Sequence, residues 1–215
     1  FALRIPARRV ATAAAGAREG MDGVLEALQV VHAPASRPEE RAAATALLEE
    51  AKAGVCGNLR GFANLAGPGR AAVERHFALH AIVTAVRHHW AAFGDAGQDD
   101  LRAYSLQLLE GVGARQEPSF VDAAATRLVC EVAKRAWPQR WPDLSGRLRA
   151  VGGASPRHAA LALTAVATLA DDVREYAADE LPERRRAELW RGLEAEGPAL
   201  CAFAQQGAAH ALSET

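Results

Sequence analysis

The stretch EVAKRAWPQRWPDL, residues 131–144, places two Trp-Pro pairs four residues apart at the end of a helical pattern. Proline fixes φ, lacks an amide hydrogen and disfavours helical geometry at the residue before it, so each pair marks a helix boundary. Tryptophan side chains at such a boundary usually pack one helical layer against the next. We therefore predict a structural corner built from Trp137, Pro138, Trp141 and Pro142; the alternative is an aromatic platform for a bound peptide.

Helical periodicity extends from this corner in both directions, and no segment shows the apolar alternation of a strand. The first helix of each pair starts near residues 21, 70, 118 and 156. The resulting period of about 40 to 50 residues is typical of HEAT-type repeats, whose hairpins bury their apolar faces only by stacking. We predict an all-α fold over residues 21–215: a right-handed α-solenoid of HEAT-type helical hairpins, with about four repeats.

Residues with strong local preferences predict where several of these helices begin and end. Ser36 is expected to cap the second helix, and the Gly- and Pro-containing segment 57–69 is expected to be a loop. Asp99 or Asp100 is expected to start the fourth helix, and Pro198 to kink or restart the last one.

A fifth helix follows Pro118 and carries apolar residues at spacings of four, three, four and four. That spacing predicts a buried stripe formed by Val121, Ala125, Leu128, Val132 and Ala136. On the same helix, Arg127, Glu131 and Arg135 are expected to form a charge ladder that faces solvent.

The composition and net charge of the chain are typical of globular proteins. Half of its 215 residues are hydrophobic, 24% are charged and the formal net charge is -1. The chain therefore has no overall positive charge that would attract nucleic acid. Its three cysteines lie far apart, which indicates neither a disulfide framework nor a zinc site. Charged residues interrupt every apolar run, so no membrane insertion is expected. Residues 1–20, with four arginines and one acid, are interpreted as a disordered leader outside the repeats or as a transit peptide.

Several further stretches carry the pattern of one family of helical-repeat proteins: VERHFALHAIVTAVRHHW, LRAYSLQLLEGV, ATLADDVREY and LPERRRAELWRGL. Together with the double Trp-Pro corner, they resemble the exportins of the importin-beta (karyopherin-beta) superfamily. LPERRR after LADDV makes the chain most similar to the exportin-5 and HASTY branch. The likeness runs from about Met21 to Cys201 and resembles the N-terminal repeats of such a receptor.

This resemblance implies a nuclear transport receptor that binds Ran-GTP and carries cargo from the nucleus to the cytoplasm, between which it shuttles. Its implied partners are cargo, in the form of structured RNA such as microRNA precursors or of protein, and nuclear pore proteins. A monomeric receptor is expected, with no cofactor. The alternative within this class is another karyopherin-beta whose cargo is protein only.

Two sets of residues are candidates for these contacts. The resemblance points Ran toward the second helices of the early repeats, where polar positions off the apolar stripes are Arg41, Glu49, Lys52, Arg102 and Gln107. Residues 131–149 hold five cations against two acids, which predicts a basic patch for RNA or an acidic partner. Its cations are Lys134, Arg135, Arg140, Arg147 and Arg149. The arginines of 184–186 are interpreted as a solvated edge, with phosphate contact as the alternative.

His76 and His80 share one face of a helix, which raises the alternative of a histidine-metal enzyme. The stretch HFALH lacks the glutamate of the H-E-x-x-H motif and has no obvious third ligand. No nucleophile elbow or phosphate-binding loop is present in the sequence either. We therefore predict no enzyme activity, no metal and no catalytic residue.

Overall fold

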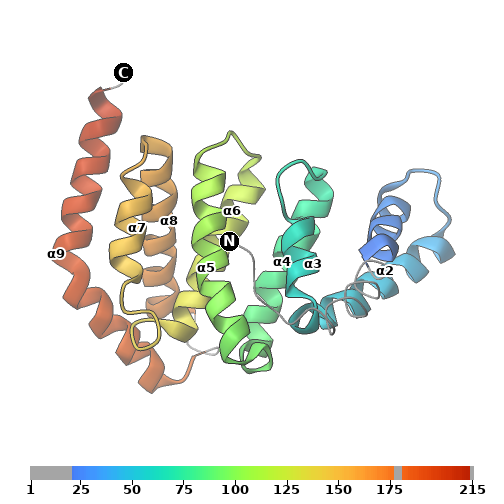
Figure 1. Ribbon diagram of the computed structural model, residues 1–215, viewed down its shortest axis with the longest axis horizontal. Helices are drawn as coiled ribbons and strands as arrows, with labels where there is room; N and C mark the ends of the chain where they lie inside the picture. Colours follow the sequence, from blue (N-terminus) through green and yellow to red (C-terminus); the bar gives the residue numbers. More distant parts are fainter. Residues whose placement is uncertain (1–20, 177–180, 214–215) are drawn as a thin grey trace, which may run out of the picture. The chain divides into compact units, whose positions relative to one another are not determined.

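The computed structural model describes residues 21–176 and 181–213. Every regular element in these two ranges is helical and none is a strand, which confirms the all-α prediction. The chain divides into two compact units, Phe1–Ala92 and Phe93–Thr215, and each is built from helices packed side by side (Figure 1). The predicted leader, residues 1–20, lies outside the described residues.

The first unit contains two helical pairs. A helix over residues 21–32 precedes α2 (Pro38–Ala53), and a short 3-10 turn, η1 (Val55–Gly57), leads to α3 (Leu59–Leu65) and α4 (Ala72–His89). Both α2 and α3 pack against α4. The buried core of this unit includes the side chains of Leu28, Leu48, Phe62, Leu65, Phe77, Leu79 and Ile82.

The start of α2 differs from the prediction, because its N-cap is Arg37 and not Ser36. Pro38 occupies the first helical position and holds the preceding residue in an extended conformation, with Arg37 at φ -70 and ψ 153. The Glu40 carboxylate accepts a hydrogen bond from the Arg37 amide at 3.0 Å. The proline therefore fixes the boundary one residue later than a serine cap would.

The segment predicted as a loop, residues 57–69, instead contains α3. The Asn58 side chain accepts a hydrogen bond from the Gly61 amide at 3.2 Å and caps this helix, while Phe62 and Leu65 are buried. Seven residues span just under two turns, which is too few to show a repeating helical pattern, and the glycines in the stretch mask it further. As a result α4 pairs with α3, and the hairpins are offset by one helix from those predicted.

The second unit is a two-layered stack. A 3-10 turn, η2 (Trp90–Phe93), precedes α5 (Gly94–Gly113). The remaining elements are α6 (Ser119–Ala136), α7 (Leu144–Gly152), α8 (Pro156–Asp171), the π-helical turn η3 (Asp172–Tyr176) and α9 (Glu183–Ser213). Helix α5 pairs with α6 and α7 with α8, while α5 also contacts α7 and α6 contacts α8 (Figure 1). The Trp-Pro corner between α6 and α7 therefore joins two hairpins.

Helix α5 begins at Gly94, five residues before the predicted start at Asp99 or Asp100. Gly94 has φ 61, a left-handed conformation that glycine adopts at little cost, and the chain changes direction there. Asp99 lies inside the helix and forms an ion pair with Arg102. The two aspartates mark the solvent side of a helix that has already started.

Helix α6 carries the predicted apolar stripe. All five of its stripe residues, from Val121 to Ala136, are at most 1% exposed. The helix buries eleven of its eighteen residues, because α5 and α8 flank it on two sides. The predicted solvent-facing charge ladder is wrong for the same reason: Glu131 is fully buried.

The last helix, α9, runs from Glu183 to Ser213 with Pro198 inside it. Of the two outcomes expected at Pro198, a kink or a restart, the restart is wrong because the helix is continuous through Pro198, and α9 changes direction along its length (Figure 1). Helix α9 contacts both α7 and α8 and so packs against the α7–α8 hairpin.

Candidate functional site

Both tryptophans of the Trp-Pro corner are buried, whereas Pro142 is exposed. Trp137 ends α6 with an extended backbone, ψ 143, and is joined to Pro138 by a cis peptide bond. Trp137 is 4% exposed and Trp141 is 3% exposed, so neither indole offers a platform to a partner. A Cβ atom at Gly192 of α9 would lie 2.5 Å from the Trp137 Cη2 atom, so α9 approaches the indole as closely as a glycine allows.

Arg185 of α9 holds this corner through hydrogen bonds that the sequence did not predict. It donates to the carbonyl oxygens of Lys134, at 2.9 Å, and of Trp137, and to the Gln139 side chain at 2.7 Å. It also pairs with Glu188, and this hydrogen bond lowers the pKa of the Glu188 carboxyl. The neighbouring Arg184 side chain is 92% exposed, so the expected solvated edge applies to Arg184 and not to Arg185.

A buried ion cluster joins α6 to the turn after α8. We define it as Arg127, Glu131, Lys134, Arg135 and Asp172. Lys134 Nζ lies 2.9 Å from Glu131 Oε1 and 2.8 Å from Asp172 Oδ2, and its side chain is 1% exposed. Arg127 reaches both carboxylates, at 3.1 Å to Glu131 and 2.9 Å to Asp172, and Arg135 lies 2.8 Å from Glu131. Because burial makes an unpaired charge costly, these contacts stabilise the packing of α6 against α8 and η3.

Cys130 lies beside the ion cluster and contacts α8. Its Sγ atom is 3.0 Å from the Ala165 carbonyl oxygen. Burial, together with the nearby Asp172 carboxylate, raises the pKa of the Cys130 thiol to about 12. The thiol therefore stays protonated at neutral pH and is a packing residue, since the thiolate is the reactive form.

The five cations of the predicted basic patch are separated by the fold. Lys134 and Arg135 belong to the ion cluster, where carboxylates neutralise them. Arg140 lies 2.6 Å from Asp95 and 3.1 Å from the Gln98 side chain. Arg147, whose side chain is 58% exposed, lies 3.9 Å from Asp143, and Arg149 is exposed. Only Arg140, Arg147 and Arg149 therefore lie at the surface of this segment.

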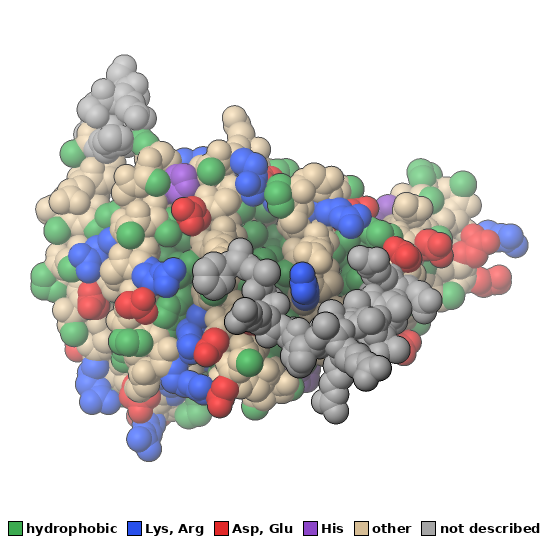
Figure 2. Space-filling view, in the orientation of Figure 1, with side chains coloured by type: hydrophobic (Ala, Val, Ile, Leu, Met, Phe, Trp, Pro, Cys, Tyr) green, Lys and Arg blue, Asp and Glu red, His purple; other side chains and the backbone are tan. Residues whose placement is uncertain are grey.

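The surface of the second unit mixes charges of both signs. Figure 2 shows cationic and acidic side chains interspersed over the face of this unit that the view presents. Opposite charges at short spacing weaken each other's field, so such a face attracts a polyanion less than a continuous basic stripe would. Any contact with a charged partner on this face therefore depends on individual side chains.

In the first unit, three candidate residues share one side of α2. Arg41, Glu49 and Lys52 are separated by spacings of eight and three, which fall within a quarter turn of a helix. Lys52 Nζ lies 2.7 Å from Glu49 Oε1 and 5.6 Å from the centre of the Phe77 ring. Arg41 donates to the carbonyl oxygens of Ala33, at 2.9 Å, and of Pro34, at 3.1 Å. Helix α2 therefore presents a preorganised, charged surface.

In the second unit, Arg102 and Gln107 lie on α5, five residues and about 140° apart around the helix. Arg102 forms an ion pair with Asp99, whereas Gln107 is exposed. These two residues therefore lie on different sides of α5 and do not form one contact surface.

The alternative of a histidine-metal site finds no ligand set. The rings of His76 and His80 are 6.3 Å apart, and no group of three or more potential ligands gathers among the described residues. Burial lowers the pKa of His80, and the nearby Lys52 lowers it further, so His80 is neutral at pH 7. Within residues 21–176 and 181–213, no helix is long and apolar enough to cross a membrane.

Comparison with known proteins finds sequence similarity to proteins named exportin-5. A protein called exportin-5 from Dictyostelium discoideum is 27% identical over 171 residues, which cover 78% of this chain. The human and mouse proteins called exportin-5 are each 27% identical, over 60% and 57% of this chain. The chain is similar to exportin-5. No protein-family model matches it.

The match is to part of exportin-5 only. The chain spans 15% of the Dictyostelium exportin-5, 11% of the human protein and 10% of the mouse protein. The similarity to exportin-5 supports the resemblance on which the sequence prediction rested. A match over this fraction of exportin-5 does not by itself assign the activity of the full-length protein to this chain.

Proposed function

We propose that this chain is part of a nuclear export receptor of the exportin-5 type, which binds Ran-GTP and carries cargo from the nucleus to the cytoplasm. The observation that carries the proposal is the similarity to exportin-5 proteins of an amoeba and two mammals, in a chain built of helical hairpins. Stacked hairpins present extended surfaces, and such surfaces bind partners without covalent chemistry. The receptor would act as a monomer and pass nuclear pore proteins while shuttling.

Helix α2 is the proposed contact for Ran-GTP in the first unit. Only Ala44 and Leu48 of this helix are buried, so most of its surface is open to solvent. The side that carries Arg41, Glu49 and Lys52 is held in place by local hydrogen bonds and an ion pair. A preorganised charged surface binds a partner of complementary charge with little loss of side-chain entropy. In the second unit, Arg102 and Gln107 of α5 are the corresponding candidates.

Arg140, Arg147 and Arg149 are the proposed contacts for cargo. Their guanidinium groups suit the phosphates of structured RNA or the carboxylates of an acidic protein. The use of Lys134 and Arg135 inside the ion cluster leaves three cations where five were predicted. That reduction favours the second candidate function, a karyopherin-beta whose cargo is protein only.

Ran-GTP and cargo would be coupled through the helical stack. Each partner favours the arrangement of helices that the other requires, which corresponds to a coupling free energy of about 1 to 3 kcal/mol. Hydrolysis of GTP releases Ran and weakens the binding of cargo by the same coupling factor. That reciprocity gives directional transport without a catalytic residue in this chain.

Isothermal titration calorimetry of this chain with Ran, loaded with either GTP or GDP, tests the proposed function. We expect binding to the GTP form and little to the GDP form. The charge-swapped variant Glu49→Lys with Lys52→Glu retains its own ion pair but reverses the charges offered to Ran, so we expect affinity to fall at least about tenfold. Arg184→Glu, a change on an exposed side chain outside the candidate surface, is the control.

Filter binding of RNA hairpins over a series of salt concentrations separates the two cargo classes. If RNA is cargo, replacing Arg147 and Arg149 with glutamine weakens binding equally for all hairpin sequences. The slope of log affinity against log salt then falls by about 0.9 for each phosphate that one of these arginines neutralises. Absence of binding at low salt supports protein-only cargo for this part of the chain.

A further inference from the structure

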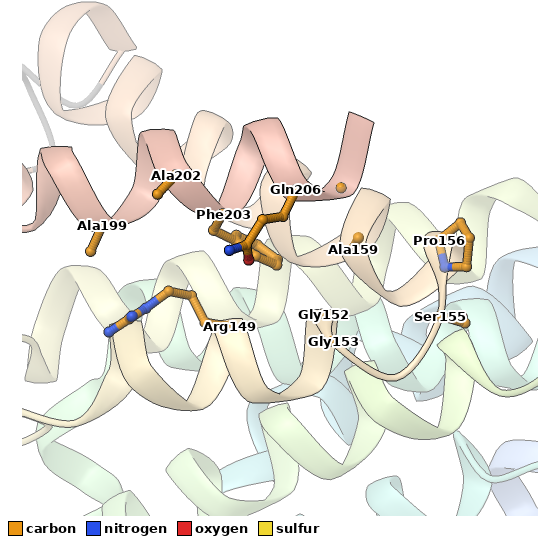
Figure 3. A pocket seen from close by; sticks show the side chains of 11 residues that line it. Arg149, Gly152, Gly153, Ser155, Pro156, Ala159, Ala199, Ala202, Phe203 and Gln206 are labelled. Carbon is orange, nitrogen blue, oxygen red and sulfur yellow. The ribbon is translucent and has the colours of Figure 1, made fainter. Parts of the chain in front are cut away.

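A pocket of about 390 Å³ lies between α7, α8 and α9 in the second unit. Small residues, including Gly152, Ala159 and Ala202, make up much of its lining. Figure 3 shows Phe203 and Gln206 projecting from α9 into this space, with Pro156 toward one end and the Arg149 side chain extending toward Ala199 at the other. The pocket therefore has an apolar end and a cationic end.

Two polar side chains of this pocket, those of Arg149 and Gln206, are not used by the fold. Neither the Arg149 side chain nor the Gln206 side chain forms a hydrogen bond or an ion pair with another residue in the described part of the chain. Among the described residues that line the pocket, Arg149 is also the only charged one, so none of them neutralises it with a carboxylate. The other surface arginines of the segment, Arg140 and Arg147, each lie near an aspartate. Arg149 is therefore the cation of this segment that is available to a carboxylate from outside.

We propose that this pocket binds a short segment of a partner protein that carries an apolar side chain and, close to it, a carboxylate. The apolar side chain packs against Phe203 and Pro156, and the Arg149 guanidinium donates hydrogen bonds to the carboxylate. The Gln206 carboxamide, which both donates and accepts, binds the peptide backbone between them. A mostly apolar pocket with a few polar groups in fixed positions is typical of sites for small groups and peptides.

An acidic peptide fits this lining better than a nucleic acid does. Tight binding of nucleic acid requires contacts to several phosphates, and this pocket supplies one cation. Its aromatic ring, Phe203, is 7% exposed and offers no open face on which a base could stack. The proposal is independent of Ran, because no candidate Ran residue lines the pocket.

Nuclear magnetic resonance titration of the isotope-labelled chain, without Ran, tests the proposal. The probes are the capped peptides acetyl-Gly-Leu-Ala-Glu-Gly-amide and acetyl-Gly-Leu-Ala-Gln-Gly-amide, which differ only in the charge. We expect both to shift signals of the pocket residues, with the Glu peptide binding about threefold to tenfold more tightly.

Three variants assign the interactions. Arg149→Gln is expected to make the two peptides bind equally, since it removes the guanidinium and leaves the apolar end intact. Ala202→Leu fills the pocket from an exposed position and is expected to abolish binding of both peptides. Arg184→Gln, a change on an exposed arginine outside the lining and outside every proposed contact surface, is the control and retains the preference.

Three results would overturn the proposal. The first is that neither peptide shifts the pocket signals at millimolar concentration. The second is a preference for the Glu peptide that persists in Arg149→Gln. The third is a short RNA duplex that shifts the same signals at lower concentration than either peptide, which would assign the pocket to nucleic acid. An unchanged signal pattern away from the pocket verifies that each variant is folded.

Discussion

The same four-residue pattern, Glu-x-Ala-Lys, occurs in α2 as residues 49–52 and in α6 as residues 131–134. In both places the lysine pairs with the glutamate three residues before it, at 2.7 Å in α2 and 2.9 Å in α6. The Lys52 side chain is 26% exposed, whereas the Lys134 side chain is 1% exposed. The same Glu-Lys pair therefore lies at the surface in the first unit and in the core of the second.

The difference arises from what each helix packs against. Helix α2 buries two of its sixteen residues, Ala44 and Leu48, so its glutamate and lysine remain at the surface. Helix α6 lies between α5 and α8, and Asp172 from the turn after α8 reaches Lys134. The lesson is that charge spacing within a helix predicts an ion pair, but the neighbouring helices decide whether that pair is available to a partner.

The largest expected effect tests the two lysines directly. Lys134→Met removes the most deeply buried cation of the ion cluster, the one that lies between Glu131 and Asp172, and is expected to lower the free energy of unfolding by about 3 kcal/mol. This is the lower end of the range for breaking a buried pair, because Arg127 still reaches both carboxylates. Lys52→Met removes a surface pair and should cost less than about 1 kcal/mol. Urea denaturation followed by circular dichroism measures both, and equal losses would contradict the comparison.

A smaller effect tests how α9 covers the end of α6. Arg185→Met removes the donor to the carbonyl oxygens of Lys134 and Trp137 while keeping an apolar stem, so we expect the free energy of unfolding to fall by about 1.5 to 3 kcal/mol. Arg184→Met is the matched control, because that side chain is 92% exposed, and it should change stability by less than about 0.5 kcal/mol. The midpoints of urea denaturation, compared at a constant slope of free energy against urea, give both changes in the free energy of unfolding. If the two arginines prove equivalent, Arg185 does not hold the corner.

The smallest pair of effects has opposite signs. Gly192→Ala places a methyl group 2.5 Å from the Trp137 ring and should cost about 1 to 3 kcal/mol, because α9 must move away from the corner. Gly146→Ala, where no atom lies within 4 Å of the added group, should stabilise α7 by about 0.5 to 1 kcal/mol. Melting temperatures of the two variants should therefore shift in opposite directions. A shared sign would show that helix propensity and not the close approach to Trp137 governs Gly192.

The sequence predicted features that depend on local spacing. The apolar stripe of α6 was predicted residue by residue, because α5 and α8 bury the side that the spacing marks. Two features depend on residues far apart in the sequence and were not predictable in this way: Asp172 reaches Lys134 across 38 positions, and Arg185 reaches Lys134 across 51. Helix α3 was missed because seven residues do not fill two turns.

The candidate contact residues were also predicted from composition and local spacing, without the contacts between distant residues. Composition placed five cations in residues 131–149, but only packing shows that Lys134 and Arg135 are neutralised inside the unit. The candidates on α2 share one side of their helix, as helical spacing predicts, whereas Arg102 and Gln107 on α5 do not. Whether any of them contacts Ran remains a prediction.

Hydrogen–deuterium exchange of this chain, alone and with Ran-GTP, tests the central claim most directly. The claim is that α2 presents its Glu-Lys pair to a partner while α6 encloses its own. We expect amides of residues 38–53 to exchange more slowly when Ran-GTP is added, and amides of residues 119–136 to exchange slowly in both states. Unchanged exchange across α2 in the presence of saturating Ran-GTP would contradict the account.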